Sequence, residues 1–143
     1  MTDGIILIDK PADMTSFGVV ARIRRVLSDQ AGKKVKVGHT GTLDPFATGL
    51  MILCVGKECK NAGGYTKLDK VYEATVRLGQ TSTTGDPEGE IVDVNDYQPS
   101  RDEVETAMTQ FIGEISQTPP AFSALKVNGV RAYQLAREGK HVD

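Results

Sequence analysis

Leu50-Met51-Ile52-Leu53-Cys54-Val55 is an uninterrupted apolar run in a chain of 143 residues. A short apolar run without polar alternation is typical of a strand that is covered on both faces. The run therefore predicts a central strand. A second run of this kind, Ile5-Ile6-Leu7-Ile8, predicts another buried strand, which Asp9-Lys10-Pro11 ends.

Between these two runs the sequence predicts one helix and two loops. Ser16 is suited to cap the helix, and Arg22 and Arg25 fall on its wet side. Residues 30–36 predict a polar, basic loop, and residues 38–49 predict a glycine-rich loop. The apolar positions of the helix recur at helical spacing and are Val19, Val20, Ile23, Val26 and Leu27.

After the central strand the pattern changes. Residues 57–69 are irregular or weakly helical, and the period-two alternation of residues 72–78 predicts a half-buried strand. The polar residues 80–89 predict the loop of a hairpin that returns as a strand at residues 91–94.

Two further helices are predicted near the end of the chain. Ser100-Arg101-Asp102-Glu103 is a capping box, and the apolar positions that follow it keep helical spacing until Gly113. Residues 130–138 predict a short helix that Gly139 closes. Strands and helices thus alternate without a strict βαβ repeat. The fold class is α/β of the α+β type, with a mixed, largely antiparallel sheet flanked by helices in one domain.

The net charge of −2 conceals two oppositely charged segments. Residues 21–60 hold eight bases and three acids, a net charge of +5, whereas residues 85–105 hold eight acids and one base, a net charge of −7. A phosphate backbone responds to the local charge rather than to the sum. The basic first half is therefore compatible with a nucleic-acid partner.

Composition excludes several classes of protein. No apolar run approaches the ~18 residues of a membrane span, and Met1-Thr2-Asp3-Gly4 has no basic signal region. Two cysteines and two histidines do not suffice for a disulfide framework or a four-ligand zinc site. We found no Walker loop and no dinucleotide fingerprint. These observations predict a cytoplasmic protein without membrane partner, metal or cofactor.

The glycine-rich loop is the segment in which chemistry is most concentrated. Gly38-His39-Thr40-Gly41-Thr42-Leu43-Asp44-Pro45-Phe46-Ala47-Thr48-Gly49 joins three glycines to an aspartate, a histidine and three hydroxyl groups. Pro45 keeps Asp44 out of the α region, which suits a catalytic carboxylate on an extended turn. An Asx turn at Asp44 beside a solvated His39 explains the residues equally well. A hydrolase built on His39 and Asp44 lacks a Gly-x-Ser-x-Gly nucleophile elbow.

Four segments resemble, in order, the motifs of the TruB family of tRNA pseudouridine synthases, which isomerise uridine 55 of the T loop. Together they run from residue 4 to about residue 140. They are Gly4-Ile5-Ile6-Leu7-Ile8-Asp9-Lys10-Pro11 with Met14-Thr15-Ser16, the loop of residues 38–49, Lys70-Val71-Tyr72-Glu73-Ala74 with residues 78–79 and 84–89, and Pro119-Pro120-Ala121-Phe122-Ser123-Ala124-Leu125-Lys126 with Gly129 and Tyr133.

The resemblance implies a pseudouridine synthase fold and a role for each matching residue. Asp44 would be the catalytic nucleophile, and Tyr72 would lie against the flipped uracil and help to remove the proton from its carbon 5. The residues implied to bind the RNA substrate are His39, Lys10, Thr42 and Lys126. The partner would be the T stem-loop of tRNA, with no cofactor, and the full-length enzyme would be monomeric.

The sequence departs from the family pattern in two places. Asp13 stands where the family has glycine after Lys-Pro-x. The later Ser-x-Gly-Thr-Tyr-Ile-Arg-type segment, whose arginine pairs with the catalytic aspartate, is absent, as is the C-terminal RNA-binding extension. We therefore expect residues 1–143 to form the N-terminal part of one catalytic domain, with an incomplete fold and little activity alone. A non-catalytic RNA-binding or tRNA-folding factor is the alternative, and a relative that modifies ribosomal or messenger RNA is another.

Overall fold

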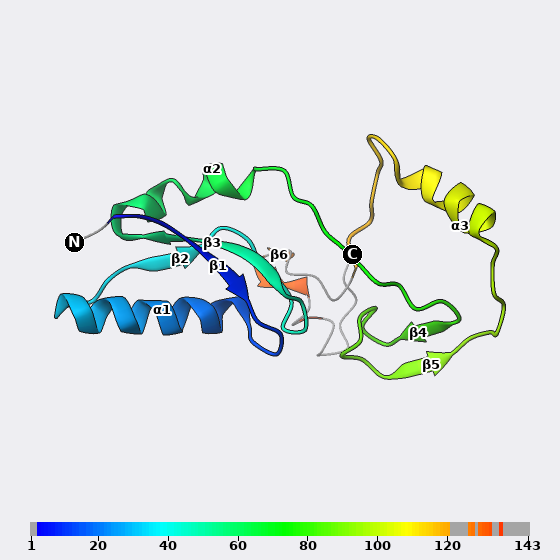
Figure 1. Cartoon of the computed structure of the whole chain (residues 1–143), viewed down its shortest axis with the longest axis horizontal. Helices are drawn as coiled ribbons and strands as arrows, with labels where there is room; N and C mark the ends of the chain where they lie inside the picture. Colours follow the sequence, from blue (N-terminus) through cyan, green and yellow to red (C-terminus); the bar gives the residue numbers. More distant parts are fainter. Residues whose placement is uncertain (1–2, 121–125, 128, 133–134, 136–143) are drawn as a thin grey trace. The chain divides into compact units, whose positions relative to one another are not determined.

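The computed structural model describes residues 3–120, 126–127, 129–132 and 135. The chain divides into two compact units, Met1–Glu73 and Ala74–Asp143 (Figure 1). The first contains all the predicted site residues except Lys126.

The first unit is built on a three-stranded antiparallel sheet with the order β1-β3-β2. β1 is Gly4–Lys10, β2 is Val37–His39 and β3 is Gly49–Val55. The pairing register sets Lys10 opposite Gly49 and His39 opposite Leu53. β3 lies between the other two strands, which confirms the prediction that the run 50–55 forms a central strand.

The prediction that both apolar runs are covered on both faces is wrong. In β1 the side chains alternate, so that Ile5 and Leu7 are exposed while Ile6 and Ile8 are partly buried. In β3 Leu50 is exposed, although the strand is buried from Leu53 onward. Among the described residues of the first unit, α1 packs on the face of the sheet that carries Met51, Leu53 and Val55, and Ile5 and Leu7 point to the other face.

Helix α1 spans Ser16–Ala31 and supplies Val19 and Val20 to the core. Its N-cap is Thr15, whose Oγ1 accepts a hydrogen bond from the Gly18 N–H at 2.9 Å, and not Ser16 as the sequence predicted. The helix ends at Gly32, which adopts the left-handed conformation with φ 61°. The buried core consists of Val19, Val20, Val35, Val37, Met51, Leu53 and Val55.

The segments on either side of β3 differ partly from the prediction. β2 includes Gly38 and His39, which the sequence assigned to the loop of residues 38–49. The preceding basic segment buries Val35 between charged neighbours. After β3 come a short 3-10 helix, η1 (Gly56–Lys60), and one turn of helix, α2 (Ala62–Thr66). These two elements confirm the weakly helical character predicted for residues 57–69.

The second unit contains a hairpin and a helix. β4 (Gln80–Ser82) pairs with β5 (Ile91–Asp93) in antiparallel fashion, so the predicted hairpin is confirmed, although β4 begins inside the expected loop. α3 spans Arg101–Met108 and begins with the predicted capping box. It continues as a 3-10 turn, η2 (Thr109–Phe111), before Gly113 takes a φ of 86°.

One predicted element is not found, and another differs at its start and is only partly described. Residues 72–78 form no strand and are exposed, because no strand in the described residues pairs with them. Residues 130–138 do not begin as a helix, since β7 (Val130–Arg131) pairs with β6 (Lys126–Val127). Ala132 and Leu135 are helical, and residues 136–139 lie outside the described residues.

The fold class of the prediction is confirmed, in that helices accompany antiparallel sheets, but the described strand pairs are all antiparallel rather than mixed. No helix in the described part of the chain has the length and apolar character needed to cross a membrane.

Candidate active site

Asp44 occupies the first position of a β-turn. The Ala47 N–H donates to the Asp44 carbonyl at 3.1 Å, and Pro45 stands at the second position, where its fixed φ favours a turn. The Asp44 side chain is exposed, and no hydrogen bond or ion pair joins its carboxylate to another described residue. The alternative of an Asx turn is therefore not what the structure shows, because the turn is closed by the backbone carbonyl.

Ser16 fixes the residue that precedes Asp44. Its hydroxyl donates to the Leu43 carbonyl at 2.8 Å and accepts from the Leu43 N–H at 2.9 Å. Ser16 is buried, with 3% of its surface exposed, so these bonds are protected from water. Sequence reasoning missed this role, because a serine at the start of a helix is equally well explained as a cap.

Lys10 fixes the residue that follows Asp44. Its side chain is fully buried at the end of β1, and its ammonium donates to the carbonyls of Pro11, Met14 and Pro45 at 2.8, 2.7 and 3.0 Å. An ammonium group has three protons, and all three are used. The structure thus places Lys10 beneath the loop, with its ammonium turned to these three carbonyls. Direct contact of Lys10 with RNA stays a prediction.

The loop is also fastened where it leaves β2. The Thr40 N–H and hydroxyl both donate to the Ile52 carbonyl, at 3.1 and 3.2 Å. His39 is partly buried, and its Nδ1 is buried without a hydrogen-bond partner among the described residues. A buried polar atom of this kind costs roughly 1–3 kcal/mol. Thr42 is exposed next to Leu43 and Asp44.

The remaining predicted site residues lie outside this loop. Tyr72 belongs to the first unit, but it is 68% exposed and forms no hydrogen bond with the loop in the described residues. Lys126 lies in β6 of the second unit, where its backbone pairs with Arg131. Residues 121–125 and Tyr133, which belong to the fourth motif, lie outside the described residues.

The site consists of the Asp44 carboxylate and the backbone around it, whose position is fixed by hydrogen bonds. The residues on both sides of Asp44 are fixed by buried side chains from β1 and α1, while the carboxylate itself faces solvent. Such a group can attack an electrophilic carbon or stabilise a cationic sugar without a cofactor. No cluster of three or more His, Cys, Asp or Glu side chains that could hold a metal occurs in the described part of the chain.

Comparison with known families identifies the class of this fold and site. A family model described as "TruB family pseudouridylate synthase (N terminal domain)" matches residues 24–143. The match covers most of the chain, so the chain belongs to the TruB family.

Three similar curated proteins share the name "tRNA pseudouridine synthase B". The chain is 49% identical over 141 residues to the "tRNA pseudouridine synthase B" of Mycobacterium sp. (strain KMS), which covers 98% of this chain and 46% of that protein. It is 48% identical over 136 residues to the protein of that name from Caulobacter sp. (strain K31), covering 95% and 42%. For Clostridium acetobutylicum the identity is 44% over 141 residues, covering 99% and 47%. The chain thus spans less than half the length of these relatives.

Proposed function

We propose that the chain belongs to an enzyme that converts uridine to pseudouridine in tRNA, at uridine 55 of the T loop, with Asp44 as the nucleophile. The observation that carries this proposal is the exposed, unpartnered Asp44 carboxylate between two residues that Ser16 and Lys10 hold in place. Catalysis requires reacting groups to be positioned before the reaction starts. The name shared by the relatives supplies the reaction and the tRNA substrate.

The reaction is an isomerisation, so its atoms balance without a co-reactant. The bond between N1 of uracil and C1′ of ribose breaks, the base turns, and a bond from its carbon 5 to C1′ forms. Carbon 5 loses a proton and N1 gains one. While the uracil is detached from the ribose, Asp44 would stabilise the substrate, either through a covalent bond or by the charge of its carboxylate. No cofactor is needed for this chemistry.

The base must leave its stack in the RNA to reach Asp44. Tyr72 is suited to receive it, because an exposed aromatic ring offers a stacking surface and a phenol can take part in proton transfer from carbon 5. His39 and Thr42 would contact the RNA loop, and in the sequence they lie on either side of Thr40, whose hydroxyl donates to the Ile52 carbonyl. Lys126 would contribute a further RNA contact. We propose a monomeric, cytoplasmic enzyme.

The test is a tritium-release assay on tRNA that carries 5-tritiated uridine. It should use the complete product of the gene that encodes this chain, with the 143-residue chain assayed beside it. Asp44→Asn and Asp44→Ala should abolish release while tRNA binding is retained. Asp69→Asn, a matched change at an exposed aspartate outside the loop, should leave the rate unchanged. Full activity of Asp44→Ala would refute the proposal.

The same assay addresses the alternative function. If the wild-type product binds tRNA tightly and releases no tritium under any condition, the chain serves as an RNA-binding or tRNA-folding factor. Mapping of the modified position then separates uridine 55 from any other uridine, and ribosomal or messenger RNA substrates from tRNA.

A further inference from the structure

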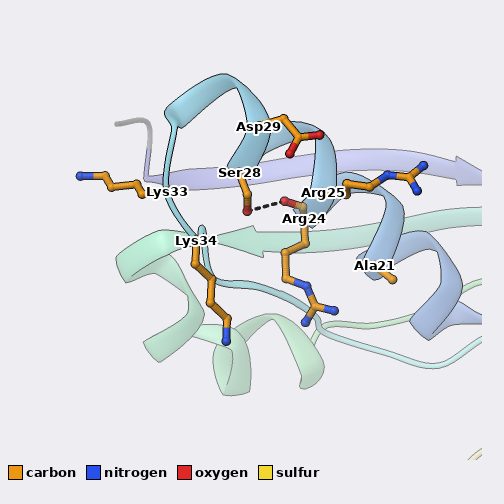
Figure 2. A pocket seen from close by; sticks show the side chains of 7 residues that line it. All are labelled: Ala21, Arg24, Arg25, Ser28, Asp29, Lys33 and Lys34. Carbon is orange, nitrogen blue, oxygen red and sulfur yellow. Dashed lines mark hydrogen bonds between the residues drawn. The ribbon is translucent and has the colours of Figure 1, made fainter.

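A basic hollow lies at the corner where α1 turns into the segment 32–36. Its volume is about 480 Å³. Figure 2 shows the side chains of Arg24 and Lys34 extending in the same direction, with Asp29 turned away from them. The residues that line the hollow are Ala21, Arg24, Arg25, Ser28, Asp29, Lys33 and Lys34.

The backbone of this corner is fixed on both sides of the two lysines. The Ser28 hydroxyl donates to the Arg24 carbonyl at 2.6 Å and accepts from the Val35 N–H at 3.0 Å. Val35 is itself buried in the core. On the other side, the Lys33 N–H donates to the Ser28 carbonyl at 3.2 Å. The backbone on either side of Lys34 is therefore tied to the helix turn that carries Arg24. The Arg24 guanidinium also lies 5.8 Å from the centre of the Phe17 ring.

The cations of the hollow form no ion pair with any described residue. Among the described residues the single ion pair joins Arg101 to Glu105, in the other unit. Four cations line the hollow against Asp29 alone. Like charges held close together disfavour the folded state, and an anionic ligand that occupies the hollow would relieve this repulsion.

A second hollow, of about 330 Å³, continues the first along α1 toward the candidate active site. The two share Ala21 and Arg25, and the second extends to Met14 and adds Arg22. The Met14 carbonyl accepts from the same Lys10 ammonium that holds Pro45. The basic hollows thus form a track that begins beside the support of the Asp44 loop.

The length of this track indicates the size of the ligand. Ser16, which holds the loop, and Ser28, which shapes the far hollow, are twelve residues apart on one helix, or about 18 Å at ~1.5 Å per residue. A single phosphate cannot reach both ends. A polyanion with evenly spaced phosphates can, and arginine and lysine are the residues that bind such a backbone.

We propose that the hollow formed by Arg24 and Lys34 binds the phosphate backbone of the RNA substrate, at nucleotides outside the loop that presents the target uridine. This inference rests on the proposed function, because it assigns the substrate of the Asp44 site to the track. It adds a second RNA contact at a distance from the reacting atoms. The contact sets affinity and orientation and leaves the chemical step to Asp44.

The test is the affinity of the complete gene product for a fluorescein-labelled tRNA transcript, measured by anisotropy across a salt series. Arg24→Glu/Lys34→Glu should weaken binding at least tenfold at low salt. It should also reduce the slope of log affinity against log salt by between one and two, since each phosphate contact contributes about 0.7–0.9. Lys57→Glu/Lys60→Glu is the matched control, because it makes the same change in net charge at two exposed lysines of η1. The control should weaken binding less than threefold.

An equal loss in both double variants, or wild-type affinity in Arg24→Glu/Lys34→Glu, would overturn the proposal. Arg24→Gln/Lys34→Gln serves as a milder pair that retains the helix, and it should show the same order of effects. Binding is read independently of turnover. If the wild type releases tritium and the Arg24→Glu/Lys34→Glu variant binds tRNA with unchanged affinity, this site is refuted and the proposed function stands. If the variant loses affinity but the wild type releases no tritium, the site stands and the proposed function is refuted.

Discussion

The hydroxyl of Ser16 engages both backbone polar groups of Leu43, with the carbonyl at 2.8 Å and the N–H at 2.9 Å. One buried side chain on α1 thereby replaces the strand neighbour that Leu43 lacks in the loop between β2 and β3. The next residue is Asp44, so the position of the candidate nucleophile depends on a hydrogen-bonded pair that is separated by 27 residues in the chain.

Ser16→Ala should therefore impair the chemical step more than RNA binding. The substitution leaves the N–H and carbonyl of Leu43 without partners, which should cost about 1–3 kcal/mol of unfolding free energy. A carboxylate displaced by about 1 Å should lower kcat on the order of 10²-fold. Single-turnover tritium release and tRNA affinity, measured on the same preparation, separate the two effects.

Thr15→Ala is the control for this prediction, because it removes the cap of the same helix without touching the loop. It should cost about 1 kcal/mol of stability and change kcat by less than about threefold. If both variants lost kcat equally, the defect would follow from helix stability, and the positioning role of Ser16 would be wrong.

Lys10→Met should destabilise the fold without removing a phosphate contact. The change leaves the carbonyls of Pro11, Met14 and Pro45 without their donor, and hydrogen bonds from a charged group are worth about 1.5–3 kcal/mol each before the cost of burying the charge. We expect the free energy of unfolding to fall by about 2–4 kcal/mol in urea denaturation.

Lys60 is an exposed lysine whose side chain forms no hydrogen bond with a described residue. Lys60→Met should therefore change the free energy of unfolding by less than about 0.5 kcal/mol. The salt dependence of tRNA binding is the decisive readout for Lys10. A reduction of the slope by about 0.7–0.9 in Lys10→Met would show that the ammonium reaches a phosphate after all.

Local sequence predicted those features whose causes lie within a few residues. The capping box of α3 needs only Ser100 and Glu103, and it forms as expected. The turn at Asp44 needs only the following proline. Sequence resemblance supplied the family and the candidate roles, which no count of residues could have provided.

Features that depend on distant partners were not predicted. Thr15 and Ser16 are both good caps, and the choice between them follows from the contact of Ser16 with Leu43, which a local pattern cannot reveal. The alternation of residues 72–78 is a strand pattern, but a strand also needs a neighbour to accept its hydrogen bonds. The resemblance implied that Lys10 binds RNA, and no local pattern indicated that its side chain would be buried. Its burial follows from the register that sets it opposite Gly49.

Asp13 tests whether the turn after β1 requires a left-handed backbone. It is the only residue other than glycine with a positive φ in the described part of the chain, at 60°. Aspartate tolerates this conformation better than most residues, and β-branched residues tolerate it least. Asp13→Val should therefore lower the free energy of unfolding by about 1–2 kcal/mol, whereas Asp13→Gly should alter it by less than about 1 kcal/mol. Thermal unfolding of the two variants checks this, and equal stability would contradict it.

The start of α3 should be sensitive to acid through Glu103. The Tyr97 hydroxyl, the Ser100 N–H and the Ser100 hydroxyl donate to its carboxylate at 2.6, 2.8 and 2.7 Å. In that order of importance they lower the pKa of Glu103 from its ordinary value of 4.5 to about 2. A carboxyl group whose pKa is lowered on folding stabilises the fold above its unfolded pKa. This stabilisation should therefore be complete above about pH 5 and disappear as the pH falls from 4.5 through 2.

Carbon-detected NMR titration of the Glu103 carboxyl group measures this directly. Tyr97→Phe removes the largest contribution, so the pKa of Glu103 should rise toward 4.5 in that variant. The helical circular dichroism signal should then decline at a higher pH than in the wild type, because the capping box loses its charged acceptor earlier in the titration. Tyr65→Phe is the matched control, since the Tyr65 hydroxyl donates to Glu58 in the other unit at 2.9 Å and not to Glu103. A wild-type titration midpoint above pH 4, or an unchanged midpoint in Tyr97→Phe, would show that the three hydrogen bonds do not persist in solution.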